Sequence, residues 1–127
     1  MAEERLRGFY RACDILVTPS RFESFGLMLV EGMMFGKPVI GCRAGGMVEV
    51  VEDGMSGLLA EPGDVDSLTA CLERLIADAA LRARLGAAAR ARYEAAFTAE
   101  RMVNDVVDVL LRVAERKQRT RSLATAE

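Results

Sequence analysis

Short, continuous apolar runs separate longer stretches in which apolar and polar residues alternate at helical spacing. The runs at residues 15–18 and 39–42 have the composition of parallel strands buried on both faces, and residues 57–60 predict a third short strand. Residues 27–35, between the first two runs, are apolar on every side except for one carboxylate, which predicts a buried helix. The order of strand, helix and strand predicts a right-handed βαβ unit, whose ligands bind beyond the carboxyl ends of the strands.

Two further helices are expected around these strands. The first is predicted over residues 2–12, and a short one over residues 47–51. The apolar residues on the inner face of the first helix are Leu6, Phe9, Tyr10 and Cys13.

Three more helices are expected after the third strand. Asp64 and Thr98 have the side chains of N-caps for the first and third, and the second is predicted over residues 79–95. The stripes expected to be buried are Val65, Leu68, Leu72, Leu75 and Ile76; then Leu81, Leu85, Ala88, Ala89 and Tyr93; then Met102, Val103, Val106, Val107, Leu110 and Val113. Beyond these stripes the apolar periodicity is lost, so we divide the chain into a folded portion, residues 1–114, and a polar, disordered tail, residues 115–127.

The carboxylate inside the apolar helix belongs to Glu31. A buried charge costs several kcal/mol, as an order of magnitude, unless it is paired or hydrogen-bonded. Glu31 therefore needs a partner, which comes either from the protein, as in a structural ion pair with an arginine elsewhere, or from a ligand.

A second carboxylate, Glu23, suggests the ligand. If the helix begins near Glu23, Glu31 lies two turns, about 12 Å, further along it. The backbone N–H groups of the first turn have no intrahelical partner and carry the positive end of the helix dipole, so they favour phosphate. These amides belong to Ser24, Phe25, Gly26 and Leu27. Two carboxylates on either side of a phosphate-binding turn would suit a sugar nucleotide.

These residues carry a family resemblance. The segment reads PSRFESFGLMLVEGMMFGKPVI and continues as GCRAGGMVEVVEDGMSGLLAEPGD. With Glu23 and Glu31 in register with Gly36-Lys37-Pro38 and the later glycines, it resembles the donor-binding part of a retaining glycosyltransferase of the GT-B fold, of the family 4 type. The resemblance implies an α/β fold: a partial Rossmann-like parallel sheet of about three strands followed by C-terminal helices, the latter part of a second GT-B domain.

The resemblance also implies roles for individual residues. Glu31 would bind the ribose hydroxyls of the nucleotide, and Glu23 would contact the transferred sugar near the reacting centre. The amides of Phe25, Gly26 and Leu27 would hold the diphosphate and the sugar. The residues expected to support these loops are Pro19, Ser20, Gly45, Gly46 and Glu49. Gly32 departs from the family pattern, which usually has Ala after the second carboxylate.

The resemblance further implies partners. The donor would be a nucleotide-sugar such as a UDP- or GDP-sugar, with no metal and no other cofactor. The basic pair that neutralises the diphosphate, and the N-terminal acceptor domain, are expected outside these residues, in the same or another chain. We take Lys37 and Arg43 as the only cations near the motif, and neither matches that pair.

Composition narrows the remaining classes of function. A chain of 127 residues with a net charge of -2 has room for one domain and gives no reason to expect nucleic acid. No apolar run approaches the roughly 18 residues that span a bilayer, so no membrane contact is encoded. Three dispersed cysteines predict reduced thiols in a cytoplasmic protein. The absence of histidine excludes Ser-His and Cys-His nucleophile systems.

Two other functions remain open. A GT-B-fold epimerase or phosphorylase would share the phosphate-binding turn. A truncated or split-gene binding module without catalysis would instead expose apolar strand edges and associate through them.

Overall fold

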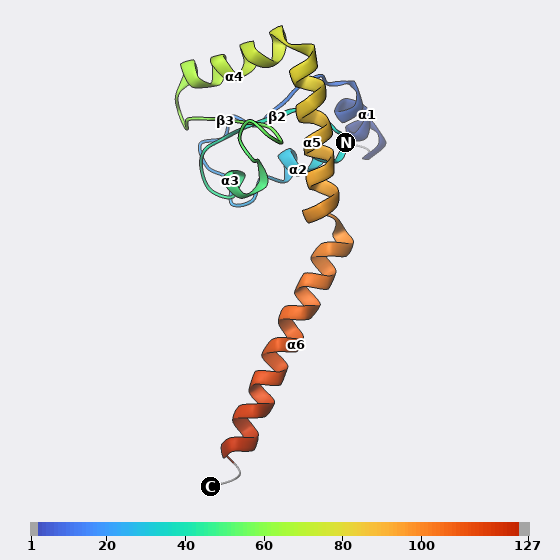
Figure 1. Cartoon of the computed structure of the whole chain (residues 1–127), viewed down its shortest axis with the longest axis vertical. Coiled ribbons are helices and arrows are strands. Elements are labelled where there is room, and N and C mark those ends of the chain that lie inside the picture. Colours follow the sequence, from blue (N-terminus) through green and yellow to red (C-terminus); the bar gives the residue numbers. More distant parts are fainter. Residues whose placement is uncertain (1–2, 125–127) are drawn as a thin grey trace. The chain divides into compact units, whose positions relative to one another are not determined.

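The computed structural model describes residues 3–124, with side chains through residue 118. The chain forms two compact units, Met1–Ala95 and Ala96–Glu127 (Figure 1). The first unit contains the sheet and five of the helices, and the second contains one helix. Each unit is described by itself.

Three parallel strands form the sheet of the first unit. They are β1 (Leu16–Val17), β2 (Val39–Cys42) and β3 (Leu58–Ala60), in the order β1-β2-β3. The register pairs Leu16 with Val39 and Ile40 with Leu58. The predicted α/β fold with three parallel strands is therefore confirmed. The expectation that β1 is buried on both faces is wrong: its two residues are half-buried, because β1 pairs only with β2 among the described strands.

Helices cover both faces of the sheet. On one face, Gly32 of α2 (Leu27–Met34) lies so close to Leu16 that an added Cβ would come within 2.4 Å of the leucine Cδ2. On the other face, α4 (Val65–Ala77) and α5 (Ala79–Ala96) pack against the sheet. Their shared core consists of Ile40, Leu58, Ala60, Cys71, Leu75 and Leu85.

The remaining helices of the first unit are α1 (Glu3–Ala12) and the single-turn α3 (Met47–Val50). Tyr10 is the buried residue of α1, whereas Leu6 and Phe9, which we expected to be inside, are exposed. In α4, Val65 and Ile76 are likewise exposed. Helical spacing marks residues on one side of a helix, but a small sheet covers only the middle of that side.

Helix ends follow the local signals. Asp64 accepts a hydrogen bond from the Ser67 amide at 3.0 Å and caps α4, as predicted. Gly36, at φ 66°, ends α2, with the Gly36 amide bonded to Met33 O and the Lys37 amide to Gly32 O. This pair of bonds is the Schellman motif that a glycine after a helix permits.

Four helix C-termini in this unit each receive a hydrogen bond from a cationic side chain. Lys37 Nζ donates to the Arg11 carbonyl of α1 at 2.8 Å. From α5, Arg90 donates to Met34 O of α2, Arg92 to Val50 O of α3 at 2.7 Å, and Arg82 to Leu75 O of α4 at 2.6 Å. These bonds satisfy terminal carbonyls and place positive charge at the negative ends of the helix dipoles.

The second unit is α6 (Ala99–Ala124), whose start is capped by Thr98, as predicted: the Arg101 amide donates to Thr98 Oγ1 at 3.2 Å. The helix continues past residue 114, where the sequence predicted a disordered tail to begin. Residues 125–127 of that predicted tail lie outside the described residues. The apolar stripe from Met102 to Val113 is exposed within this unit. Across residues 3–124, no helix combines the length and apolarity needed to cross a membrane.

The three cysteines are free thiols. Cys42 and Cys71 are buried, and Cys13 is half-buried. Burial raises the pKa of both Cys42 and Cys71, which keeps these thiols protonated and unreactive.

We expect Gly86→Ala to destabilise the fold by about 1–3 kcal/mol, because overpacking outweighs the higher helix propensity of alanine. A Cβ at Gly86 of α5 would lie 2.3 Å from the Gly36 carbonyl oxygen, so backbone must shift. Gly8→Ala is the matched control: nothing lies within 4 Å of its added Cβ in α1. This variant should be more stable by up to about 1 kcal/mol. Urea unfolding measures both, and equal effects at the two positions would contradict the close α5 contact.

Candidate functional site

The loop that follows β1 carries Glu23 and leads into α2 at the carboxyl edge of the sheet. Thr18 N donates to Ile40 O at 2.8 Å, which holds the start of this loop against β2. Our expectation that α2 begins near Glu23 is wrong. Gly26 adopts a left-handed conformation, at φ 92°, and the helix begins at the next residue, Leu27. Glu23 therefore lies in the loop, and Glu31 lies in the second turn of the helix.

The N-terminus of α2 presents backbone donors. The amides of Leu29 and Val30 bond to Gly26 O, at 3.0 and 3.3 Å. The first-turn amides of Leu27 and Met28 precede them and have no intrahelical acceptor. Within the described part of the chain, no side chain caps this end. Of the predicted amides, Leu27 and Gly26 lie at the helix end, and Ser24 and Phe25 lie in the preceding loop. Met28 is a further candidate that the sequence did not indicate, because its amide lies in the first turn only when the helix begins at Leu27.

The loop after β2 packs against the backbone of the loop that carries Glu23. Gly46 N donates to Glu23 O at 2.8 Å. A Cβ at Gly45 would lie 2.1 Å from Glu23 O, and one at Gly46 would lie 2.3 Å from Ser24 O. Only glycines allow the two loops to approach this closely.

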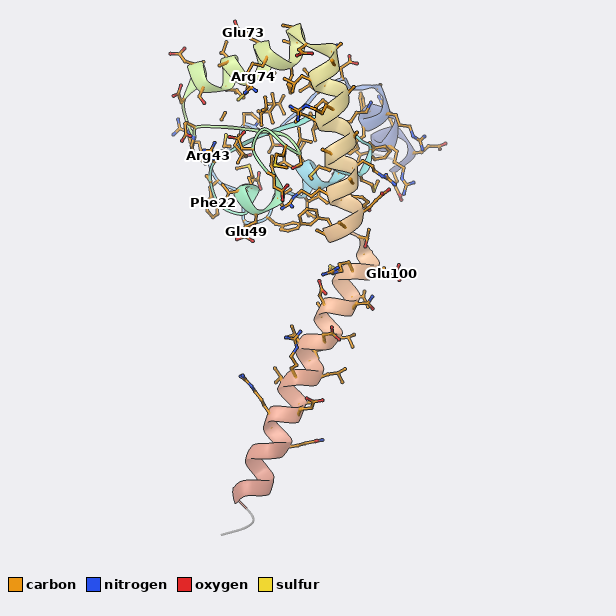
Figure 2. The ribbon with its side chains drawn as sticks, in the orientation of Figure 1. Phe22, Arg43, Glu49, Glu73, Arg74 and Glu100 are labelled. Carbon is orange, nitrogen blue, oxygen red and sulfur yellow. The ribbon has the colours of Figure 1, made fainter. Side chains whose placement is uncertain are left out.

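Of the other residues predicted to support the loops, Glu49 donates its amide to Gly46 O at 3.1 Å. Pro19 is exposed and Ser20 half-buried, directly after β1. The Glu49 side chain is exposed on α3 (Figure 2), and its carbonyl accepts a hydrogen bond from Arg92 at 2.6 Å.

Glu31 has a tyrosine as its partner. Tyr10 Oη of α1 donates a hydrogen bond to Glu31 Oε2, and the carboxylate is half-buried. Among residues 3–118, the protein group that the structure places against this carboxylate is thus a neutral tyrosine, in place of an arginine. Burial, together with the hydrogen bond to Glu31, raises the pKa of Tyr10 well above its ordinary value. The hydroxyl therefore remains a donor at neutral pH.

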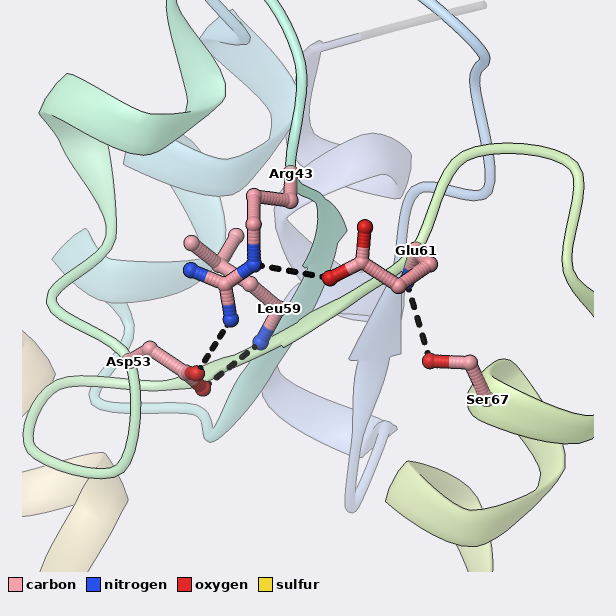
Figure 3. A network of polar contacts seen from close by, with 5 residues as sticks. All are labelled: Arg43, Asp53, Leu59, Glu61 and Ser67. Carbon is pink, nitrogen blue, oxygen red and sulfur yellow. Dashed lines mark hydrogen bonds and ion pairs between the residues drawn. The ribbon is translucent and has the colours of Figure 1, made fainter.

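Arg43 stands at the centre of a polar network that joins the loops after β2 and β3 (Figure 3). Its Nη2 pairs with Asp53 Oδ2 at 2.6 Å, and its Nε with Glu61 Oε1 at 2.9 Å. Asp53 also accepts a hydrogen bond from the Leu59 amide, and Ser67 Oγ accepts one from the Glu61 amide. The side-chain hydrogen bonds to Asp53 and Glu61 raise the pKa of Arg43. Its guanidinium thus binds two carboxylates of the protein itself.

Arg21 is a cation that the sequence reasoning overlooked. Lys37 and Arg43 both bind protein groups in the structure. Arg21 is exposed on the loop between β1 and Glu23, with its Nε 3.8 Å from the position of a Cβ added at Gly63. Its place inside the motif was the signal that could have drawn attention to it. In the described part of the chain, no group of three or more acidic or cysteine side chains could hold a metal ion.

The raised pKa of Tyr10 predicts a loss of stability at alkaline pH. In the unfolded chain, Tyr10 ionises near the ordinary tyrosine pKa of about 10. Its contribution to the free energy of unfolding is therefore complete below that pH. Above that pH the contribution is lost, at up to about 1.4 kcal/mol per pH unit. Tyr10→Phe should lack this additional loss. Urea unfolding of both proteins at pH 8 and pH 11 measures the difference, in which the contributions of Cys42 and Cys71 cancel. Parallel losses in the two proteins would contradict the Tyr10–Glu31 bond.

Comparison with known proteins places this chain in a family. The model of the family described as Glycosyl transferases group 1 matches residues 1–92. The D-inositol 3-phosphate glycosyltransferase of Nocardiopsis dassonvillei is 42% identical over 106 residues, which are 84% of this chain and 24% of that protein. This chain therefore spans about a quarter of the length of that relative.

Solved structures agree with the sequence comparison. Sucrose-phosphate synthase from Thermosynechococcus elongatus superposes with a TM-score of 0.82 and 33% identity, over 89% of this chain and 28% of that chain. Anabaena HepE, solved in complex with UDP-glucose, superposes with a TM-score of 0.76 and 32% identity, over 80% of this chain and 28% of that one. The chain thus belongs to the group 1 glycosyltransferases, with the fold of their C-terminal GT-B domain.

Proposed function

We propose that this chain is the donor-binding part of a retaining glycosyltransferase of the family 4 type. The observation that carries the proposal is the placement of Glu23 and Glu31 on either side of the uncapped N-terminus of α2. The likeness to Anabaena HepE, which was solved with UDP-glucose, supports a nucleotide-sugar as the ligand.

In this proposal, the parts of the donor follow the direction of α2. Glu31 accepts hydrogen bonds from the ribose hydroxyls, and Glu23 from the hydroxyls of the transferred sugar. The diphosphate lies between them, on the amides of Gly26, Leu27 and Met28, where the helix dipole favours negative charge. The loop formed by Gly45 and Gly46 supports the backbone of Glu23 and Ser24.

The proposed reaction transfers the sugar with retention of its anomeric configuration. The acceptor oxygen forms the new bond to the anomeric carbon as the bond to the diphosphate oxygen breaks. The acceptor proton passes to the departing diphosphate. Preorganised amides at the start of α2 stabilise the negative charge that develops on the leaving group. This chemistry uses no metal, and an N-terminal domain in the same or another chain binds the acceptor and supplies further cations.

Glu31→Gln tests the nucleotide site. We expect one of UDP, GDP and ADP to raise the melting temperature of the unaltered chain by several degrees, since ligand at about 100 times Kd adds about 2.7 kcal/mol of stability. The variant should lose most of this shift, because an amide still accepts from Tyr10 but replaces the charge that binds the ribose. Glu73→Gln, an exposed carboxylate on α4, is the matched control. A shift that survives in Glu31→Gln would contradict the assignment.

Glu23→Gln tests the sugar side separately. In the unaltered chain, the glucose conjugate of the selected nucleotide should bind more tightly than the nucleotide itself. Glu23→Gln should reduce this difference by about tenfold, as expected for a hydrogen bond to a charged group, and leave binding of the bare nucleotide unchanged. Isothermal titration calorimetry with both ligands measures the two affinities. If the variant bound the nucleotide and its glucose conjugate more weakly by the same factor, the assignment of Glu23 to the sugar would be contradicted.

A further inference from the structure

We propose that Tyr10 is a positioning residue that orients the Glu31 carboxylate for the ribose, a role that rests on the proposed function. Among residues 3–118, the hydrogen bond that the structure gives to this carboxylate comes from Tyr10 Oη. The carboxylate lies on α2 and the hydroxyl on α1, so the orientation of Glu31 depends on how these two helices are held together.

The hydroxyl of Tyr10 is itself fixed by packing. The tyrosine is 6% exposed, and its ring stacks on Phe35 with the centroids 5.4 Å apart and the planes 7° from parallel. The Arg11 guanidinium lies 5.9 Å from the centre of the same Phe35 ring. Lys37 donates to the Arg11 carbonyl at 2.8 Å, which ties the end of α1 to the residues that follow α2. A ring held in this way can direct its hydroxyl without further ordering when a ligand arrives.

The choice of a tyrosine matters for the chemistry of Glu31. A carboxylate has two oxygens and about four positions at which it can accept hydrogen bonds. Tyr10 occupies one of these positions on Oε2 and leaves Oε1 to other donors. An arginine fork would take both oxygens and neutralise the charge. The neutral tyrosine instead fixes the carboxylate while its charge stays available to two neighbouring hydroxyls, which is what the vicinal diol of a ribose requires.

Tyr10→Phe, which keeps the stacked ring, tests this role by calorimetry with two forms of the nucleotide that the thermal titration selects. One form is the ribonucleotide and the other its 2′,3′-dideoxy analogue. We expect the variant to bind the ribonucleotide about tenfold more weakly, as for one hydrogen bond to a charged group, and to bind the dideoxy analogue with unchanged affinity. Tyr93→Phe on α5 is the matched control and should change neither affinity. Phe35→Leu, which keeps the hydroxyl but removes the ring beneath it, should show the same selectivity to a smaller extent.

The outcomes separate this inference from the proposed function. Equal weakening of both nucleotides by Tyr10→Phe would reveal a merely structural role, and unchanged binding of both would show no role; either result overturns the inference. If Tyr10→Phe does not fold, Phe35→Leu serves in its place: selective loss of ribonucleotide binding supports the inference, and equal weakening or unchanged binding of both nucleotides overturns it. If the unaltered chain and Glu31→Gln bind every nucleotide equally, or not at all, the proposed function fails and the role of Tyr10 fails with it.

Discussion

The short helices of this fold depend on donors for their terminal carbonyls, because the last four carbonyls of a helix have no intrahelical partner. Helix α5 supplies three of the four cationic side chains that donate to helix C-termini in the first unit. The guanidinium groups of Arg82, Arg90 and Arg92 reach the C-termini of α4, α2 and α3. An arginine can do this while it serves other acceptors, as Arg92 does with the Glu49 carbonyl and the Glu52 carboxylate. One helix thus binds the C-termini of α2, α3 and α4. The N-termini of these three helices follow the carboxyl ends of β1, β2 and β3, where the loops of the candidate site lie.

Close contacts between glycines and backbone at both ends of α2 complete this arrangement. Gly86 brings α5 against the Gly36 carbonyl at the end of α2. At the N-terminal end of α2, Gly45 and Gly46 bring the loop after β2 against the backbone of Glu23 and Ser24. Helix α2 is therefore held at both ends by contacts that no larger residue permits. The position of its N-terminal amides is a property of the backbone packing and requires no side-chain cap.

The sequence predicted those features whose signals are local. Apolar runs revealed the strands, and the caps at Asp64 and Thr98 and the glycine at Gly36 are each decided within a few residues. The start of α2 was misplaced because the deciding feature is the left-handed conformation of Gly26, which a glycine permits but does not require.

Long-range partners were not predictable in the same way. An arginine on the polar side of a helix has the sequence pattern of a solvent-exposed residue, although Arg92 binds a carbonyl 42 positions away. Tyr10 was correctly expected to face inward, but its hydroxyl meets Glu31 only because the fold brings α1 and α2 together at this point. Periodicity identifies the buried side of a helix and says nothing about which polar atom lies opposite.

The bond between Tyr10 and Glu31 can nevertheless be traced to one local feature. Because Gly36 adopts a left-handed conformation, the chain turns at once and the Lys37 amide bonds to Gly32 O at 3.0 Å. The same turn places the Lys37 side chain at the C-terminus of α1, where it binds the carbonyl of Arg11. The neighbouring Tyr10 is thereby set over Phe35, the residue that precedes Gly36. The way in which α2 ends thus determines the donor that its own carboxylate meets, one turn before that end, and a helix stop signal becomes part of the candidate site.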